Sequence, residues 1–256
     1  MAKIIAVANQ KGGVGKTTTS VNLSASLAAA EKRVLLIDLD PQANSTSCVG
    51  IDPTPEQSTI YEVLVNGERV EDCICDTSLD YLKAVPSHID LSGGELELVG
   101  MVSRETRLRD ALVASAKQNF DYVFLDCPAP LNILTVNALT AAHSVLVPVP
   151  AEFLAKKGLA MLQKTIERVT ERLNEMLYIE GILLTLYSPS HRFASEIEAE
   201  LAEKYGSLVY TTKIRRNDRI TEAPNSGKPL ILYDVLSSGA QDYLSLAAEV
   251  IARNSK

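Results

Sequence analysis

The sequence predicts an α/β fold, a doubly wound and mostly parallel sheet with helices on both faces. Short runs of β-forming residues alternate with helical segments along the whole chain, which is the pattern of parallel strands joined by crossover helices. Several runs, such as residues 34–37 and 123–125, are hydrophobic at every position, as expected for strands covered on both faces. No linker rich in Pro, Gly or Ser and no repeat divides the 256 residues, so we expect a single domain over residues 1–256.

The expected elements follow from these patterns in order. Strands are expected at residues 3–8, 33–38, 81–85, 122–126, 144–149, 180–186 and 207–212. Helices are expected at residues 16–30, 104–119, 131–142, 154–173, 192–205 and 239–252, the last with an apolar face for packing on the sheet. In such a sheet, ligands bind beyond the carboxyl ends of the strands, so residues that directly follow strands are the candidates for a site.

Composition excludes several classes of protein. No apolar run reaches the roughly 18 residues that a membrane-spanning helix needs. The four cysteines lack the paired spacing of a zinc site and the three histidines are scattered, so free thiols in a reducing cytoplasm are expected. A net charge of −7 argues against a surface coated with nucleic acid, although it leaves room for a local basic patch.

A glycine-rich segment, NQKGGVGKTT at residues 9–18, lies between an expected strand and an expected helix. Its glycines let successive N–H groups point at phosphate oxygens, and the helix adds its positive end. Lys16 would reach the β- and γ-phosphates, Thr17 would bind Mg²⁺, and Thr18 would help to hold the α-phosphate. Gln10 stands where G-x-x-x-x-G-K-[ST] has its first glycine, and a second lysine, Lys11, lies inside the loop. A glycine-rich turn without a ligand is the alternative.

The loop KGGVGKTT resembles that of the ParA/MinD family of deviant Walker A ATPases, and the likeness is closest to the short chromosomal type of ParA, called Soj. Further matching stretches follow in family order over nearly the whole chain: DLDPQANS at 38–45, DCP at 126–128, LTVNAL at 134–139, EAP at 222–224 and GKP at 227–229. The resemblance implies a P-loop ATPase that uses ATP and Mg²⁺. The loop residues expected to bind the nucleotide are Lys11, Gly12, Gly13, Val14, Gly15, Lys16, Thr17 and Thr18.

Three carboxylates follow expected strands, and the resemblance gives each a role. Asp40 would orient the attacking water. A carboxylate there could instead hydrogen-bond to a ligand of Mg²⁺, or cap the next helix. Asp38 would hold a Mg²⁺-bound water or order the loop. Asp126 ends a hydrophobic strand and would hold Mg²⁺ together with Thr17, while a structural aspartate at a strand end is the alternative.

Two further residues are assigned from the family. Lys11 would reach across an ATP-dependent homodimer to the partner's phosphates and act in catalysis with Lys16 and Asp40. A solvated loop lysine is the plain alternative. Asn217 would contact the adenine, although Arg215 stands where relatives usually have a proline.

A basic stretch lies near the carboxyl end of the chain. The segment from residue 211 to residue 228 contains five cationic residues and only two acidic ones, Asp218 and Glu222. The resemblance implies that the dimer uses these cations to bind double-stranded DNA without sequence preference, on the nucleoid. A solvated charged face is the alternative. The residues expected to contact DNA are Lys213, Arg215, Arg216 and Arg219.

The chain departs from its relatives at several positions, which leaves its cargo open. These positions are Ala129, Pro130, Asn132, Lys156, Lys157, Ser190 and Arg215. We expect a slow ATPase switch of the cytoplasm that a ParB-like or other cargo adaptor stimulates, for chromosome or plasmid partition or cargo positioning. A regulator that binds only proteins is the main rival. An iron–sulfur reductase would need a cysteine pair that is absent at the family positions. A membrane-bound relative would need a basic, bulky-apolar tail, so no membrane partner is expected.

Overall fold

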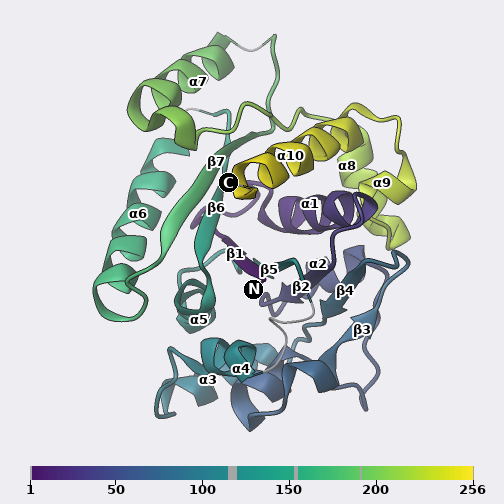
Figure 1. Ribbon diagram of the computed structural model, residues 1–256, viewed down its shortest axis with the longest axis vertical. Coiled ribbons are helices and arrows are strands. Elements are labelled where there is room, and N and C mark those ends of the chain that lie inside the picture. The colour runs from purple at the N-terminus through teal and green to yellow at the C-terminus, as the bar shows by residue number, and fades with distance from the viewer. Residues whose placement is uncertain (1, 115–119, 153–154, 191, 256) are drawn as a thin grey trace.

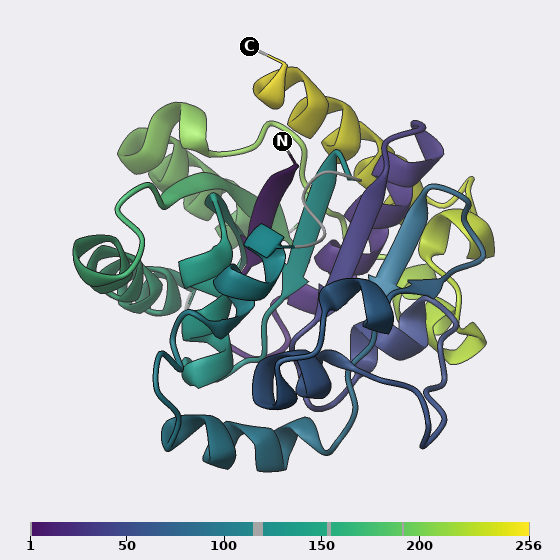
Figure 2. The ribbon, with the colours of Figure 1, turned by 60° about the horizontal axis from the view of Figure 1, so that its bottom comes forward.

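In the computed structural model, which describes residues 2–114, 120–152, 155–190 and 192–255, the named strands form one seven-stranded sheet. The strand order is β3-β4-β2-β5-β1-β6-β7, and every pair is parallel except β3 with β4. Figure 2 shows β1, β5, β2 and β4 side by side. The strands are β1 (Lys3–Val7), β2 (Val34–Asp38), β3 (Cys75–Asp76), β4 (Leu82–Val85), β5 (Tyr122–Asp126), β6 (Ser144–Pro150) and β7 (Tyr178–Thr185). The predicted fold class is confirmed.

Helices cover both faces of the sheet (Figure 1). Helices α1 and α10 pack together on one face, whereas α4, α5 and α6 lie on the other. The helices are α1 (Lys16–Ala29), α2 (Asn44–Cys48), α3 (Leu91–Val99), α4 (Arg107–Ala114), α5 (Ile133–Ala141), α6 (Ala155–Arg172), α7 (Arg192–Tyr205), α8 (Asp218–Glu222), α9 (Leu230–Tyr233) and α10 (Ser238–Asn254). Among the described residues, no helix has both the length and the apolarity to cross a bilayer.

The continuous hydrophobic runs of the sequence serve both layers of the core. In β2, Leu35 and Ile37 belong to the cluster under α4–α6, while Val34 and Leu36 belong to the cluster under α1 and α10. Successive side chains of a strand point to opposite faces, so a strand covered on both sides needs an apolar residue at each position. The residues of β5 also alternate between these two clusters. Its last residue, Asp126, is a buried carboxylate at the carboxyl end of the strand.

The strand expected at residues 207–212 is wrong. The chain there forms a short 3-10 turn at Gly206–Leu208 and one isolated bridge to β7 at Val209. The N–H groups of Thr211 and Thr212 donate to the Glu249 carboxylate of α10, at 2.9 and 3.0 Å, so a side chain takes the place of a neighbouring strand. Helix α3 and the short elements between β2 and β4 were not expected.

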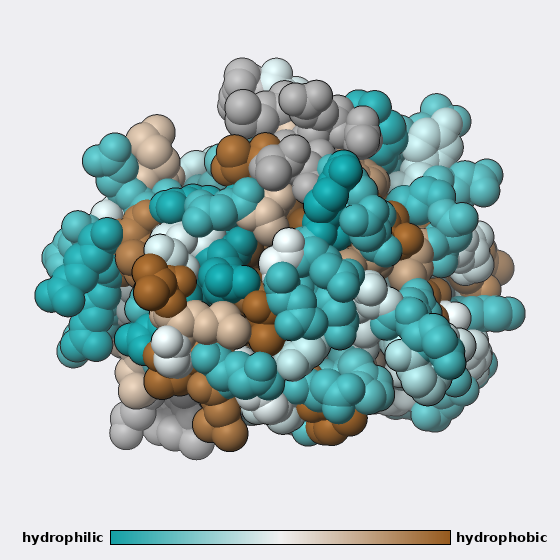
Figure 3. All heavy atoms as spheres, turned by 90° about the horizontal axis from the view of Figure 1, so that it is seen from below, coloured by the Kyte–Doolittle hydropathy of each residue, from teal (hydrophilic) through white to brown (hydrophobic). Residues whose placement is uncertain are grey.

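The lower face of the molecule carries apolar side chains singly or in small groups among hydrophilic ones (Figure 3). On and just after α3, Leu96 is 79% exposed and Val102 is 88% exposed. Isolated exposed apolar residues of this kind are normal on protein surfaces.

Candidate nucleotide site

The phosphate loop joins the buried end of β1 to the first turn of α1, as the sequence predicts. Gly13 and Gly15 have φ of +71° and +90°, a left-handed backbone conformation that residues other than glycine rarely adopt. The first hydrogen bond of the helix runs from the Thr19 N–H to the Gly15 carbonyl oxygen at 2.9 Å. The three preceding N–H groups, from Lys16 to Thr18, therefore have no partner within the helix and are free to bind an anion.

Residues from distant strands fix the shape of this loop. Asn9 Nδ2 donates to the Pro148 carbonyl oxygen at 2.7 Å, and Asn9 Oδ1 accepts from the Lys11 N–H at 3.1 Å. At the end of β7, Thr185 Oγ1 donates to the Val14 carbonyl oxygen at 2.8 Å. Sequence reasoning gave no role to Asn9 or to Thr185. Asn9 directly follows the strand expected at residues 3–8, and Thr185 lies inside the strand expected at residues 180–186. The loop is therefore held in shape by the ends of β6 and β7.

Lys16 is nearly buried beside the loop, and its Nζ donates to the Lys11 carbonyl oxygen at 3.4 Å. Burial lowers the pKa of Lys16, while the nearby carboxylates of Asp126 and Asp40 act in the opposite direction. A buried ammonium is stabilised when an anion approaches it. The position suits a group that neutralises phosphate charge.

Two carboxylates face each other at the ends of neighbouring strands, because the register pairs Asp38 of β2 with Asp126 of β5. Asp126 Oδ1 accepts from Ser20 Oγ at 2.8 Å, whereas the buried Asp126 Oδ2 has no hydrogen-bond partner among the described residues. Burial, and next the charge of Asp38, raise the pKa of Asp126 to about 7, and the neighbouring hydroxyls of Ser20 and Thr17 oppose this shift. Asp126 thus offers an unsatisfied oxygen next to Thr17.

Both carboxylate oxygens of Asp38, by contrast, have hydrogen-bond partners. Its Oδ1 accepts from the Asp40 N–H at 3.0 Å, and its Oδ2 accepts from the Thr46 N–H and Oγ1 at 2.9 and 2.7 Å. The pKa of Asp38 is raised by burial, against these hydrogen bonds. Of the two roles expected for Asp38, the geometry favours ordering of the loop that carries Asp40. Thr46 was not found from the sequence.

Asp40 lies on the loop after β2, half-buried, with its Oδ1 accepting from the Gln42 N–H at 3.0 Å. Ala43 follows with φ of +52°, which costs a residue other than glycine on the order of 1 kcal/mol. Strain of this kind is common in segments that change conformation. The assignment of Asp40 to the attacking water stays a prediction.

Hard cations prefer oxygen ligands, and the Thr17 hydroxyl with the open oxygen of Asp126 fits this preference. Within the described part of the chain, no cluster of three or more His, Cys, Asp or Glu side chains could hold a metal. A Mg²⁺ ion here would therefore take its remaining ligands from phosphate oxygens and water, as in phosphate-loop proteins in general.

The chain is similar to proteins of known name over almost its full length. A family model described as an AAA domain matches residues 2–179. The chain is 50% identical to the sporulation initiation inhibitor protein Soj of Bacillus subtilis, with 98% of this chain and 99% of Soj covered. It is 48% identical to the chromosome partitioning protein ParA of Caulobacter vibrioides, with 98% and 94% covered. The chain belongs to the ParA/Soj family.

Solved structures support the assignment of this chain to the ParA/Soj family. A cobyrinic acid a,c-diamide synthase from Mycobacterium smegmatis with bound ADP and magnesium is 34% identical, with a TM-score of 0.83 and coverage of 100% and 97%. The septum site-determining protein MinD of Pyrococcus horikoshii, complexed with Mg-ADP, is 26% identical, with a TM-score of 0.80 and coverage of 98% and 96%. The predicted family and fold are thus confirmed.

Asn217, expected at the adenine, has both ends of its amide engaged in this ParA/Soj chain. Its Oδ1 accepts from the Arg219 N–H at 2.8 Å and caps α8, and its Nδ2 donates to Ser238 Oγ at 2.6 Å. A cavity of about 240 Å³ opens instead beside the first turn of α1, and Asn217 is not among its lining residues. Its lining includes Thr17, Thr18, Asn22, Ala223, Pro224, Lys228 and Pro229. Space next to the phosphate helix is therefore enclosed by Ala223 and Pro224 of the EAP stretch and by Lys228 and Pro229 of the GKP stretch.

The four cations expected to contact DNA all have acidic partners within the chain. Arg215 forks onto the nearly buried Asp242, with a shortest distance of 2.6 Å between Nη2 and Oδ1. The other pairs are Lys213 with Glu198, Arg216 with Glu152 at 3.0 Å, and Arg219 with Glu222 at 2.6 Å and Asp234 at 3.4 Å. Counting charges along the sequence could not reveal these partners, because Glu152, Glu198 and Asp242 come from other elements.

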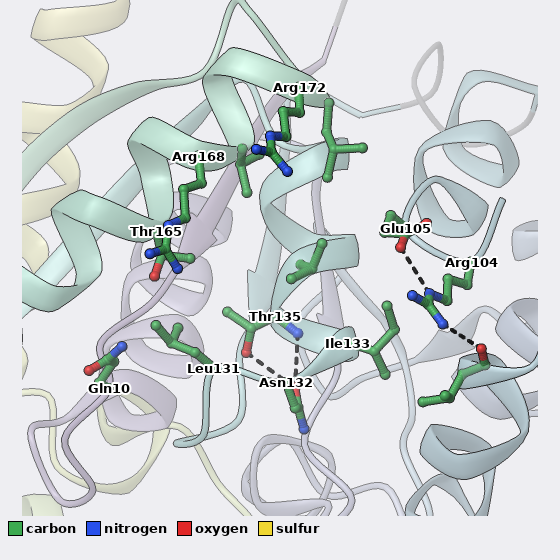
Figure 4. A pocket seen from close by; sticks show the side chains of 14 residues that line it. Gln10, Arg104, Glu105, Leu131, Asn132, Ile133, Thr135, Thr165, Arg168 and Arg172 are labelled. Atoms are coloured by element: carbon green, nitrogen blue, oxygen red, sulfur yellow. Dashed lines mark hydrogen bonds and ion pairs between the residues drawn. The ribbon is translucent and has the colours of Figure 1, made fainter.

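A groove of about 740 Å³ is lined by residues of α5, of α6 and of the segment around Arg104 (Figure 4). Arg168 and Arg172 extend toward it from α6, and Gln10 of the phosphate loop lies at one side. Asn132 accepts from the Thr135 N–H at 3.1 Å, which caps α5, and donates to Glu95 at 2.6 Å. This departure from the family pattern thus has a structural role.

The remaining departures have little or no visible role. Pro130 accepts from Thr135 Oγ1 at 2.9 Å, and Ser190 Oγ lies 3.0 Å from Ser188 Oγ. Nothing in the structure explains Ala129. Lys156 and Lys157 are on α6, and their side chains lie outside the described ones.

Proposed function

We propose that this chain is a Mg²⁺-dependent ATPase that hydrolyses ATP to ADP and phosphate slowly unless it is stimulated. The observation that carries the proposal is the buried, unpartnered Oδ2 of Asp126 beside the Thr17 hydroxyl, at the end of a loop with free N–H groups. A bound Mg²⁺ supplies positive charge to the phosphates there. MinD of Pyrococcus horikoshii, a structural neighbour, is complexed with Mg-ADP.

The residues divide the work as follows. The N–H groups of residues 12–18 bind phosphate oxygens, and the ammonium of Lys16 neutralises charge on the β- and γ-phosphates. Thr17 and Asp126 would hold Mg²⁺. Asp40 accepts a hydrogen bond from the attacking water and orients it toward the γ-phosphate. Replacing Asp40 by Ala should remove hydrolysis while nucleotide binding remains; normal turnover by this variant would contradict its role.

ATP joins two copies of the chain, and Lys11 of each reaches the phosphates of the other. The dimer binds double-stranded DNA without sequence preference through the basic stretch that holds Lys213, Arg215, Arg216 and Arg219, with Arg215 contributing least because Asp242 holds it, which places the dimer on the nucleoid. A ParB-like or other cargo adaptor stimulates hydrolysis and returns the monomers. The names of the relatives Soj and chromosome partitioning protein ParA support this proposal.

DNA binding of the purified protein tests the proposal, measured with ATP, with ADP and without nucleotide over a salt series. Binding that requires ATP, falls steeply with salt and weakens in Arg219→Ala is expected, since phosphate contacts dominate non-specific binding. Lys32→Ala, which removes a cation outside the basic stretch, serves as the control. Binding that is equal in all three nucleotide states would overturn the switch.

A regulator that uses ATP only to select protein partners is the second candidate, favoured by the pairing of all four cations with carboxylates. Absence of ATP-dependent DNA binding at low salt, together with normal ATP-dependent dimerisation, would select this candidate.

A further inference from the structure

Glu152 connects the phosphate loop with the basic segment through one carboxylate. Its Oε2 lies 3.3 Å from Lys11 Nζ, and its Oε1 lies 3.0 Å from Arg216 Nη2. Glu152 lies two residues after Pro150, the last residue of β6, and the N–H of the intervening Ala151 donates to the Thr185 carbonyl oxygen at 2.9 Å. The carboxylate is therefore held close to the end of β6, a strand that pairs with β1 and β7.

Both cations stand on fixed backbone. The N–H of Lys11 donates to Asn9 Oδ1, its carbonyl oxygen accepts from Lys16, and a Cβ at Gly158 of α6 would lie 3.9 Å from Lys11 Cβ. The N–H of Arg216 donates to the Tyr187 carbonyl oxygen at 3.0 Å, beside the bridge between Tyr187 and Arg215. Only the side chains of Lys11 and Arg216 can leave Glu152.

We infer that Glu152 is a positioning residue that acts as an internal competitor for phosphate. In the monomer its carboxylate occupies Lys11 and Arg216, the two cations that the partner's nucleotide and the DNA backbone would otherwise engage. The inference rests on the proposed function, because it assigns Lys11 to the partner subunit and Arg216 to DNA. Glu152 thereby sets the ATP concentration at which the dimer forms and weakens DNA binding by the monomer.

The strength of this restraint follows from exposure. The side chains of Lys11, Glu152 and Arg216 are 37%, 43% and 57% exposed, and exposed pairs are weak enough for a bound phosphate to displace them. Lys11 and Arg216 share the carboxylate of Glu152, so removal of Arg216 should strengthen the ion pair between Glu152 and Lys11. Glu152→Gln should therefore favour dimerisation, whereas Arg216→Ala should oppose it.

Dimerisation tests the inference, with the dimer fraction measured by analytical ultracentrifugation against the concentration of a non-hydrolysable ATP analogue. Glu152→Gln should lower the half-maximal concentration about five-fold, and Arg216→Ala should raise it about two-fold. Glu222→Gln is the matched control, since Glu222 is also 43% exposed and pairs with Arg219, and it should cause no change. No shift in Glu152→Gln, or an equal shift in Glu222→Gln, would overturn the inference.

A nucleotide-free measurement separates this inference from the proposed function. Acetylation of Lys11 by a limiting reagent, followed by mass spectrometry, should be about three-fold faster in Glu152→Gln, while Lys213, which pairs with Glu198, should react equally in both proteins. If the wild-type protein forms no dimer with nucleotide, the proposed function fails and the acetylation rates alone decide. Equal rates at Lys11 would overturn the pairing itself.

Discussion

The phosphate loop and the basic segment at residues 213–219 differ in how their functional groups are held. In the loop, strand ends fix the backbone, and Lys16 and Asp126 are buried, with an open oxygen on the latter. In the basic segment, the three arginines are exposed and Lys213 is half-buried, and each of these cations is paired with a carboxylate. Backbone geometry makes the first region ready for a ligand, whereas the second must exchange one anion for another. Substitutions in the two regions should therefore have effects of very different size.

The largest effect is expected for Lys16→Ala in the loop. Loss of a fixed charge at the transferred phosphate should lower the ATPase rate by about a hundred-fold or more. Because burial disfavours the ammonium of Lys16, the nucleotide-free protein should keep or gain thermal stability. A phosphate-release assay and a thermal melt measure the two quantities, with Lys32→Ala, at a half-buried lysine outside the loop, as the control. A fall in melting temperature together with activity would make Lys16 a structural residue instead.

A smaller effect, on stability, is expected for Asp126→Asn. The pKa of Asp126 is raised to about 7 in the folded protein, from about 3.9 when unfolded, so the native state binds the extra proton between these values. The metal-free protein therefore loses stability as the pH rises from about 4 to about 7, and the asparagine variant, which cannot ionise, should be more stable by about 2–4 kcal/mol at pH 8. The gain should vanish near pH 4. Urea unfolding in the presence of a chelator measures it, and a gain that is independent of pH would contradict this cause.

These two predictions concern residues that the sequence alone identified, and the reason is local. A glycine-rich segment between a strand and a helix is a local sequence pattern that can be recognised without any tertiary contact, and Asp126 emerges where a fully apolar strand ends. The supporting residues Ser20, Thr46 and Thr185 were missed because each acts on a partner from another element, which only the strand order brings close. The unexpected turn at residues 207–212 has the same origin, in Glu249 of α10.

Thr46→Val sharpens the contrast within the nucleotide site. The variant removes the hydroxyl that donates to Asp38 Oδ2 at 2.7 Å and leaves a buried carboxylate with one hydrogen bond fewer, which should cost about 1–3 kcal/mol of stability. The loop that carries Asp40 should also lose order, so the ATPase rate should fall more than ATP affinity does. Denaturant unfolding and steady-state kinetics test both; Thr165→Val, at a half-buried position on α6, is the matched control.

The smallest effects are expected in the basic segment, where they differ between two arginines. Arg215 is forked onto Asp242, so Arg215→Ala should change DNA affinity by less than about two-fold and cost up to about 1 kcal/mol of stability. Arg219 holds two exposed carboxylates that DNA phosphate can replace, so Arg219→Ala should weaken ATP-dependent DNA binding several-fold and lower the salt slope by about one. Fluorescence anisotropy over a salt series compares them. Equal losses in both variants would mean that the acidic partner of a surface arginine does not govern its availability to phosphate, which would remove the distinction between the two arginines.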